Sequence, residues 1–239
     1  MAETAADRDL RKKLVFERQF TPVVQRAFSA ERKLFRGLII TMGLTPEARL
    51  LSAIWRDPLR AHYDLVAGTF ANLSDVTDPQ SLLRATVGLE KFIETASIAG
   101  ASIISATSAR NMQTASSLAA EMLRQEQQVV TNIAVAAAGS RILARKQKSR
   151  EGTIIITETQ TSAEGGKVIG ATAQGQEIKV WQTVRDGRVR PAHVAANGQR
   201  SSISDVFVVG GERLLYPGDR SLGASVGNVA YCRCAAIYR

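Results

Sequence analysis

The residue types best suited to special chemistry lie near the C-terminus of this 239-residue chain, which has only two cysteines and two histidines. Cys232, Cys234 and His193 fall in that region, and Asp186 and Arg190 precede the histidine. If Arg190 begins a helical turn, it shares a face with His193. Asp186 could then pair with Arg190 or orient the imidazole through a ring N–H. These side chains predict either an acid–base site or a polar clamp that fixes the turn. We favour the clamp, because no nucleophile or metal with an assigned role accompanies them.

The two cysteines form a second candidate group. Residues two apart in an extended strand point to the same face, so Cys232 and Cys234 could both face His193. With Asp186 as a fourth ligand, these side chains would make the donor set of a zinc site. The C-x-C spacing is unusual for structural zinc, and we favour two small side chains that close the core, with no metal. A disulfide between them is not expected, because same-face side chains in a strand point in parallel.

The order of residues around these groups resembles the C-terminal module of Mu-F-like phage head morphogenesis proteins. The resemblance covers the chain from around residue 150 to its end, and it departs from the family pattern at Tyr231, where Asn is usual, and at Ile156, where Arg is usual. The matching residues are Trp181, Asp186, Arg190, His193, Gly198, Asp205, Phe207, Tyr216, Pro217, Gly218, Asp219, Cys232, Arg233 and Cys234.

This resemblance implies a minor head protein of a tailed bacteriophage. Such a protein is a virion component inside the phage head, and it is assembled in the host bacterial cytoplasm. Its expected partners are the portal protein, which it would surround in multiple copies, other head proteins and packaged double-stranded DNA. Its expected roles are head morphogenesis and DNA packaging or ejection. On this interpretation the protein binds rather than catalyses and needs no cofactor. The structural cluster that holds the module together would be Trp181, Asp186, Arg190, His193, Cys232 and Cys234.

The charge of the chain gives a second indication of partners. Its net charge is +9 and its pI is near 10.0, which favours an anionic partner or, more simply, a solvated basic surface. The densest run of cations, without an intervening acid, comprises Arg141, Arg145, Lys146, Lys148 and Arg150. A helix face of this kind can neutralise several phosphates in a salt-dependent way. The alternative is an ordinary basic helix end, which the helix dipole favours.

Two other classes of function remain open. One is a metal-dependent hydrolase or toxin-like effector that uses the Asp/Arg/His/Cys cluster, and the other is a free DNA-binding protein. No phosphate-binding loop, Ser-His-Asp order or paired catalytic carboxylates support an enzyme. Residues 1–16 lack the apolar core of a signal peptide, and no apolar run reaches the roughly 20 residues of a membrane span. We therefore expect no membrane association.

The elements that must position these residues follow from periodicity. We expect an α+β protein, with an elongated N-terminal helical bundle in residues 1–150 and a small module with an antiparallel sheet in residues 151–239. Helices are predicted at 3–40, 46–71, 79–107 and 111–150, with a kink or break near Pro22 and a bend or split near Pro58. In the module, 153–172 fits a helix or a strand, 191–196 a short helix, 178–184 and 229–238 strands, and 206–209 with 212–216 a hairpin. Trp181, Phe207 and Tyr216 are expected in its core.

Overall fold

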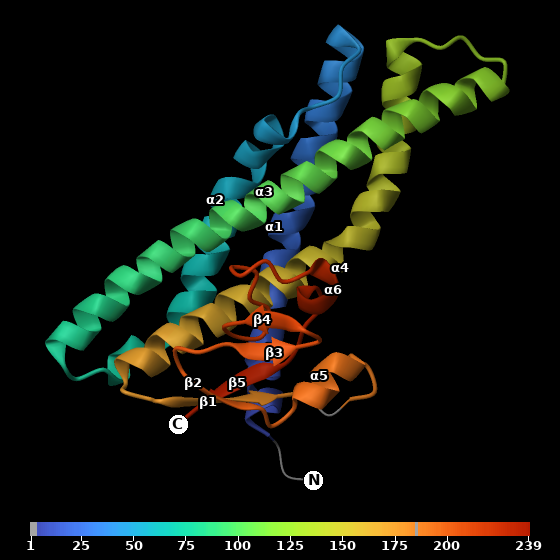
Figure 1. Cartoon of the computed structure of the whole chain (residues 1–239). Coiled ribbons are helices and arrows are strands. Elements are labelled where there is room, and N and C mark those ends of the chain that lie inside the picture. Colours follow the sequence, from blue (N-terminus) through green and yellow to red (C-terminus); the bar gives the residue numbers. More distant parts are fainter. Residues whose placement is uncertain (1–3, 185) are drawn as a thin grey trace. The chain divides into compact units, whose positions relative to one another are not determined.

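The computed structural model describes residues 4–184 and 186–239 and has the predicted α+β fold (Figure 1). Its four long helices are α1 (Ala5–Met42), α2 (Ala48–Ala71), α3 (Pro79–Gln125) and α4 (Asn132–Ala173), and a short 3-10 helix, η1 (Leu73–Asp75), follows α2. No helix in the described ranges combines the length and apolar character needed to cross a bilayer.

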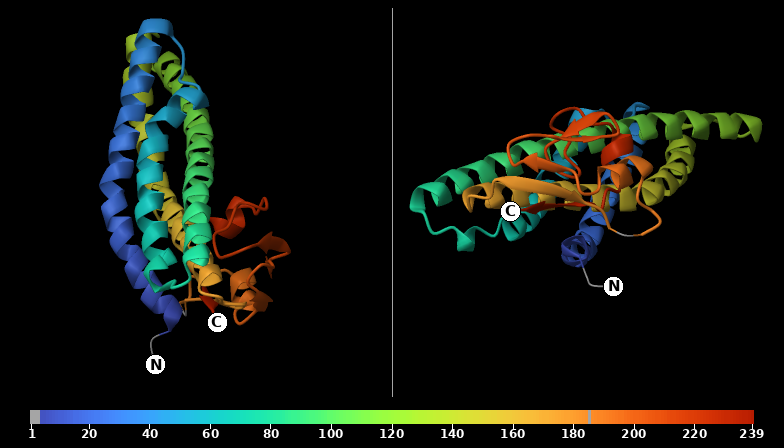
Figure 2. Two further views of the ribbon diagram at one scale, coloured as in Figure 1. Left: turned by 90° about the vertical axis from the view of Figure 1, so that its left-hand side faces the viewer. Right: turned by 60° about the horizontal axis from the view of Figure 1, so that its bottom comes forward.

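Short elements make up the rest of the chain. They are β1 (Ile178–Gln182), α5 (Pro191–Ala196), β2 (Arg200–Ser202), β3 (Phe207–Val209), β4 (Glu212–Leu214), α6 (Val226–Val229) and β5 (Ala235–Tyr238). Strand β1 lies between β2 and β5 and is antiparallel to both. Strands β3 and β4 form the predicted hairpin, in which Gly210 and Gly211 both have positive φ, as a tight turn of this length requires. Figures 1 and 2 show these strands gathered beside the C-terminal half of α4.

The chain forms two compact units. Unit 1 comprises Met1–Gln19, Ala61–Ala96 and Ile155–Arg239, and unit 2 comprises Phe20–Arg60 and Ser97–Ile154. Each long helix contributes a segment to both units, so the units differ from the consecutive segments 1–150 and 151–239. The predicted boundary after residue 150 lies within α4. Gly139, also within α4, is a close-packing position, since a Cβ there would lie 2.9 Å from the Phe35 ring.

Several predicted boundaries were wrong. Helix α3 continues past residue 107 to Gln125, because the Thr107 and Thr114 hydroxyls bond to carbonyls four residues earlier and remain compatible with the helix. Pro22 and Pro58 lie inside α1 and α2 without ending either helix. The closing strand begins only at Ala235, since α6 and the positive φ of Tyr231 interrupt the extended chain before it.

The segment at 153–172 is helical, and the strand alternative was wrong. It forms the C-terminal half of α4, in which residues 157–166 are all buried. The buried residues include a polar run, Thr157, Glu158, Thr159, Gln160, Thr161, Ser162 and Glu164. A helix buried on all sides shows no apolar stripe, which is why periodicity defined this segment poorly.

Each unit contains an apolar core. In unit 2 the core gathers around Phe35, Leu51 and Met112. In unit 1 the core of the C-terminal module includes Trp181 and Phe207, whose rings meet edge-on at 5.3 Å. Tyr216 is also buried, as predicted, and so are Cys232 and Cys234.

Candidate functional site

His193, Cys232 and Cys234 come together in the core of unit 1, although the two cysteines precede β5 and do not lie in a strand as expected. The imidazole Nδ1 lies 3.4 Å from Cys234 Sγ and 3.7 Å from Cys232 Sγ. All three side chains are 2% exposed, and their potential ligand atoms lie within 4.8 Å of one another. We call these three residues the His–Cys cluster. It is the one group in the described residues with a metal-ligating arrangement of at least three such side chains.

The other ring nitrogen of His193 has a fixed partner. Nε2 lies 2.7 Å from Asn228 Oδ1. The amide group of Asn228 is itself oriented, because its Nδ2 donates to the Val209 carbonyl at 2.9 Å and to Glu212 Oε2 at 3.0 Å. Asn228 must therefore present its oxygen to His193, so Nε2 carries a proton and Nδ1 faces the sulfurs.

The electrostatics of the cluster favour a thiolate on Cys232. The hydrogen bond from Cys234 lowers the pKa of the Cys232 thiol to about 5 against the effect of burial, and His193 lowers it further. Burial lowers the pKa of His193, but Cys232 outweighs this effect and the net shift is upward. The pKa of Cys234 is raised by its bond to Cys232 and by burial, while the Trp181 indole N–H acts in the opposite direction. The titrations of these three groups are therefore coupled, and the direction of the shifts favours the thiolate at Cys232 over that at Cys234.

Local structure explains how the three side chains meet. Helix α5 begins directly after Arg190 with Pro191 at its first position, which suits the fixed φ of proline and places His193 in the first turn. Trp181 of β1 packs edge-on against the His193 ring with centroids 5.5 Å apart. Tyr231 adopts φ +55°, and the chain then turns both cysteines inward just before β5.

Asp186 and Arg190 do not join this cluster as expected. Asp186 forms an ion pair with Arg233, with Oδ2 2.7 Å from Nη1, and accepts the Arg188 backbone N–H at 3.1 Å. The Arg190 guanidinium donates to the Ala230 carbonyl. The proposed Asp186–Arg190 pair and the use of Asp186 as a fourth metal ligand were therefore wrong. Both residues still act as clamps, but on separate partners: Arg190 holds Ala230, just before the two cysteines, and Asp186 holds Arg233, which lies between them.

Unit 1 also contains a buried ion network that the sequence patterns did not predict. Arg220 makes a two-pronged contact with Glu158 of α4, with both N···O distances 2.9 Å, and the Tyr63 hydroxyl donates to Glu158 at 2.8 Å. Burial and the neighbouring Glu158 charge raise the pKa of Tyr63 well above its ordinary value. Glu158 and Arg220 lie 62 residues apart in the sequence, so no local pattern links them.

A second set of contacts joins α4 to the C-terminal module within unit 1. Lys13 Nζ donates to Glu164 at 2.7 Å and to Gln160 at 2.8 Å. Gln160 in turn donates to the backbone carbonyl of Cys234 at 2.8 Å, and Glu164 accepts the backbone N–H of Ala236 at 2.8 Å. These buried groups are paired with one another, so they fix the strand that follows Cys234 and leave no reactive side chain exposed among them.

The helix places the five cations of the basic run, residues 141–150 of α4, on different faces, so they differ in exposure. Arg141, Arg145 and Lys148 are exposed, at spacings that place them on one face, whereas Lys146 is half-buried. Lys148 has an ion pair with Glu151 at 3.5 Å. Arg150 points inward, because it donates to Ser108 Oγ at 3.1 Å and its Cζ lies 5.9 Å from the centroid of the Phe28 ring. Arg150 is therefore not a surface contact for an anionic partner, and this part of the prediction needs correction.

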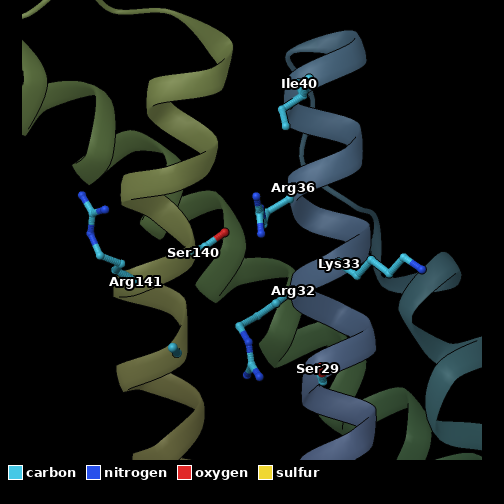
Figure 3. Close-up of a pocket in the computed structure, with 8 residues that line it drawn as sticks. Ser29, Arg32, Lys33, Arg36, Ile40, Ser140 and Arg141 are labelled. Carbon is cyan, nitrogen blue, oxygen red and sulfur yellow. The ribbon is translucent and has the colours of Figure 1, made fainter.

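A cavity of about 520 Å³ lies between α1 and α4 within unit 2, and we call it the basic groove. Figure 3 shows Arg32 and Arg36 of α1 reaching into the space opposite Ser140, while Lys33 and Arg141 point away from it. Its lining contains no acid and comprises Ser29, Arg32, Lys33, Arg36, Ile40, Ser140, Arg141 and Ala144. Arg32 also donates to Gln147 Oε1. Guanidinium groups at such a groove suit a phosphate or carboxylate ligand.

Comparisons of this chain with protein-family models, with curated proteins and with solved structures found no match.

Proposed function

We propose that the protein is a bacteriophage minor head protein, a virion component that associates with the portal inside the capsid. It acts by binding rather than catalysis in head morphogenesis and in DNA packaging or ejection. The observation that carries the proposal is the ordered set of residues from Trp181 to Cys234 that resembles the Mu-F-like module. During assembly it would reside in the host bacterial cytoplasm, with the portal, other head proteins and DNA as partners.

The packing of those residues supports a structural role for the module. Trp181, Phe207, Cys232 and Cys234 belong to one apolar core, and Arg190 ties the core's rim to the Ala230 carbonyl. At 2% exposure, the His–Cys cluster offers little access to a substrate. An enzyme of the hydrolase class would need a nucleophile or base that a substrate can reach.

Contact with DNA, or with an acidic face of the portal, is supported by the charges of unit 2. Arg32 and Arg36 of α1 reach into the basic groove (Figure 3), and Arg141, Arg145 and Lys148 are exposed along one face of α4. Surfaces of this kind bind phosphates through their charge, with an affinity that falls steeply as salt rises.

Quantitative mass spectrometry of phage particles tests the virion assignment. The particles would be produced from the genome that encodes this chain and separated into DNA-filled and empty heads. We expect the protein in DNA-filled particles at a fixed ratio to the portal. Loss from emptied particles alone would indicate ejection with the DNA. Absence from all particles would refute the proposal.

A salt titration of DNA affinity tests the nucleic-acid contact separately. The Arg36→Gln/Arg141→Gln double variant should bind double-stranded DNA more weakly, and the slope of log K against log salt should become shallower by about 0.9 for each phosphate that the variant no longer neutralises. Arg124→Gln is the matched control, because Arg124 is an exposed arginine of unit 2 that pairs with Glu121. Equal salt slopes for the wild type and the double variant would remove the basic groove from the proposal.

A further inference from the structure

We propose that His193, Cys232 and Cys234 bind one zinc ion per chain, through His193 Nδ1 and both Sγ atoms, with a water molecule as the fourth ligand. This site is independent of the role in phage heads, since it lies inside the C-terminal module and requires no partner. Three features support it: the distances within the cluster, the hydrogen bonds around the ligands and the space beside them.

The distances within the cluster match those in a zinc site. With Zn–N of about 2.1 Å and Zn–S of about 2.3 Å, tetrahedral angles place each nitrogen–sulfur pair about 3.6 Å apart. The observed separations from Nδ1 are 3.4 Å and 3.7 Å, one on each side of that value. The two sulfurs lie within 4.8 Å of each other, and a tetrahedral site requires about 3.8 Å between them. Only small side-chain adjustments would complete the geometry.

The histidine is already oriented in the way that metal-binding histidines usually are. Such a residue coordinates through one ring nitrogen and donates from the other to a carboxylate, carbonyl or amide oxygen. In this protein Nε2 faces Asn228 Oδ1 at 2.7 Å, and Asn228 is in turn fixed by Glu212 at 3.0 Å. This second layer of partners leaves Nδ1 directed at the sulfurs, where a cation would sit.

The charges and the space beside the cluster are also suitable. Two thiolates and a neutral imidazole would balance the charge of a divalent cation, and sulfur ligands select zinc over magnesium or calcium. Binding would displace the thiol protons, because cysteine binds a metal as the thiolate. A cavity of about 20 Å³ adjoins all three ligands and is lined on its other side by Arg188, Arg190, Tyr231 and Arg233 among others. That volume accommodates one water molecule.

Metal content and cobalt substitution of the whole 239-residue chain test this proposal. The protein would be produced with supplementary zinc, purified under reducing conditions and analysed by elemental mass spectrometry for zinc per chain. Cobalt(II) exchange would then report the ligands, because thiolate–cobalt charge transfer and intense visible bands identify a tetrahedral site with sulfur. We expect stoichiometric metal and an X-ray absorption spectrum with two sulfur neighbours. A folded, reduced wild-type protein without stoichiometric metal, or metal without sulfur neighbours, would overturn the proposal.

Variants separate this site from adventitious binding. Cys232→Ser and Cys234→Ser should each remove one sulfur from the cobalt spectrum, and Asn228→Ala should weaken zinc binding about 10- to 100-fold. His62→Gln is the matched control, because His62 is a buried histidine of the same unit whose Nε2 lies 3.0 Å from Thr159 Oγ1. It should keep the full metal content. If the double variant Cys232→Ser/Cys234→Ser retained stoichiometric metal, the ligands would lie elsewhere and the assignment would fail.

Discussion

Replacing Gly170 with alanine should destabilise the protein, although alanine is the better helix former. Gly170 lies on α4 against the end of α2, and a Cβ at this position would lie 1.7 Å from the Ala71 carbonyl oxygen and 2.6 Å from its carbon. Gly166, one turn earlier, meets Ala67 of α2 in the same way, with its Cβ 2.3 Å from the carbonyl oxygen. The obstacle in both cases is backbone, so no side-chain rotation relieves it.

The expected magnitude follows from two opposing effects. Alanine in a helix interior is favoured over glycine by about 1 kcal/mol. Relief of the clash requires α2 and α4 to separate by roughly 1 Å or more at a closely packed contact, and overpacking of this kind costs about 1–3 kcal/mol. Because the Gly170 contact is far shorter than a van der Waals distance, the cost lies at the upper end. The net loss for Gly170→Ala should be about 2 kcal/mol.

Gly68→Ala is the matched control, since Gly68 is an exposed position of α2 where an added Cβ meets nothing within 4 Å. There only helix propensity operates, and the variant should be more stable by about 1 kcal/mol. Thermal unfolding followed by circular dichroism would compare the two variants with the wild type. A change of 1 kcal/mol shifts Tm by about 2–4 °C for a chain of this size, so the two shifts should have opposite signs.

The sign of the Gly170 shift decides the matter. If Gly170→Ala unfolded at the same temperature as the wild type or above it, the close approach of α2 and α4 would not exist as described. Gly166→Ala gives an independent check of the same contact and should also lower Tm.

Three further predictions concern buried polar groups of unit 1. Burial lowers the pKa of His62 to about 3, so between that value and the unfolded pKa near 6.5 only the unfolded state binds a proton. The free energy of unfolding should therefore fall as pH decreases from 6.5, by up to about 1.4 kcal/mol per pH unit. Urea unfolding at several pH values should show a weaker dependence of stability on pH in His62→Gln than in the wild type. Arg220→Ala leaves the buried Glu158 carboxylate without its cation and should lower the free energy of unfolding in urea by about 3–5 kcal/mol. Arg220→Lys keeps the positive charge but loses the two-pronged guanidinium contact, and its loss should be smaller. Equal losses for the two variants would contradict the ion-pair argument. Lys179→Met removes the donor to the Asp205 and Leu215 carbonyls and should lower stability by about 1–3 kcal/mol, and an unchanged Tm would show that those carbonyls have other partners.

Features that depend on neighbouring residues could be predicted from the sequence. Helical periodicity located α1 and α2, Pro191 marked the start of α5, and Gly210-Gly211 located the hairpin between β3 and β4. These features were predictable because backbone propensity and side-chain periodicity act over a few residues. The sequence offered the meeting of His193 with the two cysteines only as a possibility, because 39 and 41 residues separate them.

The pairing and burial of polar groups, in contrast, emerged only from the tertiary packing. Asp186 pairs with Arg233, although Arg190 is nearer in sequence, because the turn after Tyr231 brings Arg233 beside it. Glu158 and Glu164 are buried in α4 because Arg220 and Lys13, which lie far away in the sequence, supply their counter-charges. A charge can be buried at low cost only when an opposite charge contacts it. Whether such a partner is in contact depends on how distant segments pack and not on any local pattern.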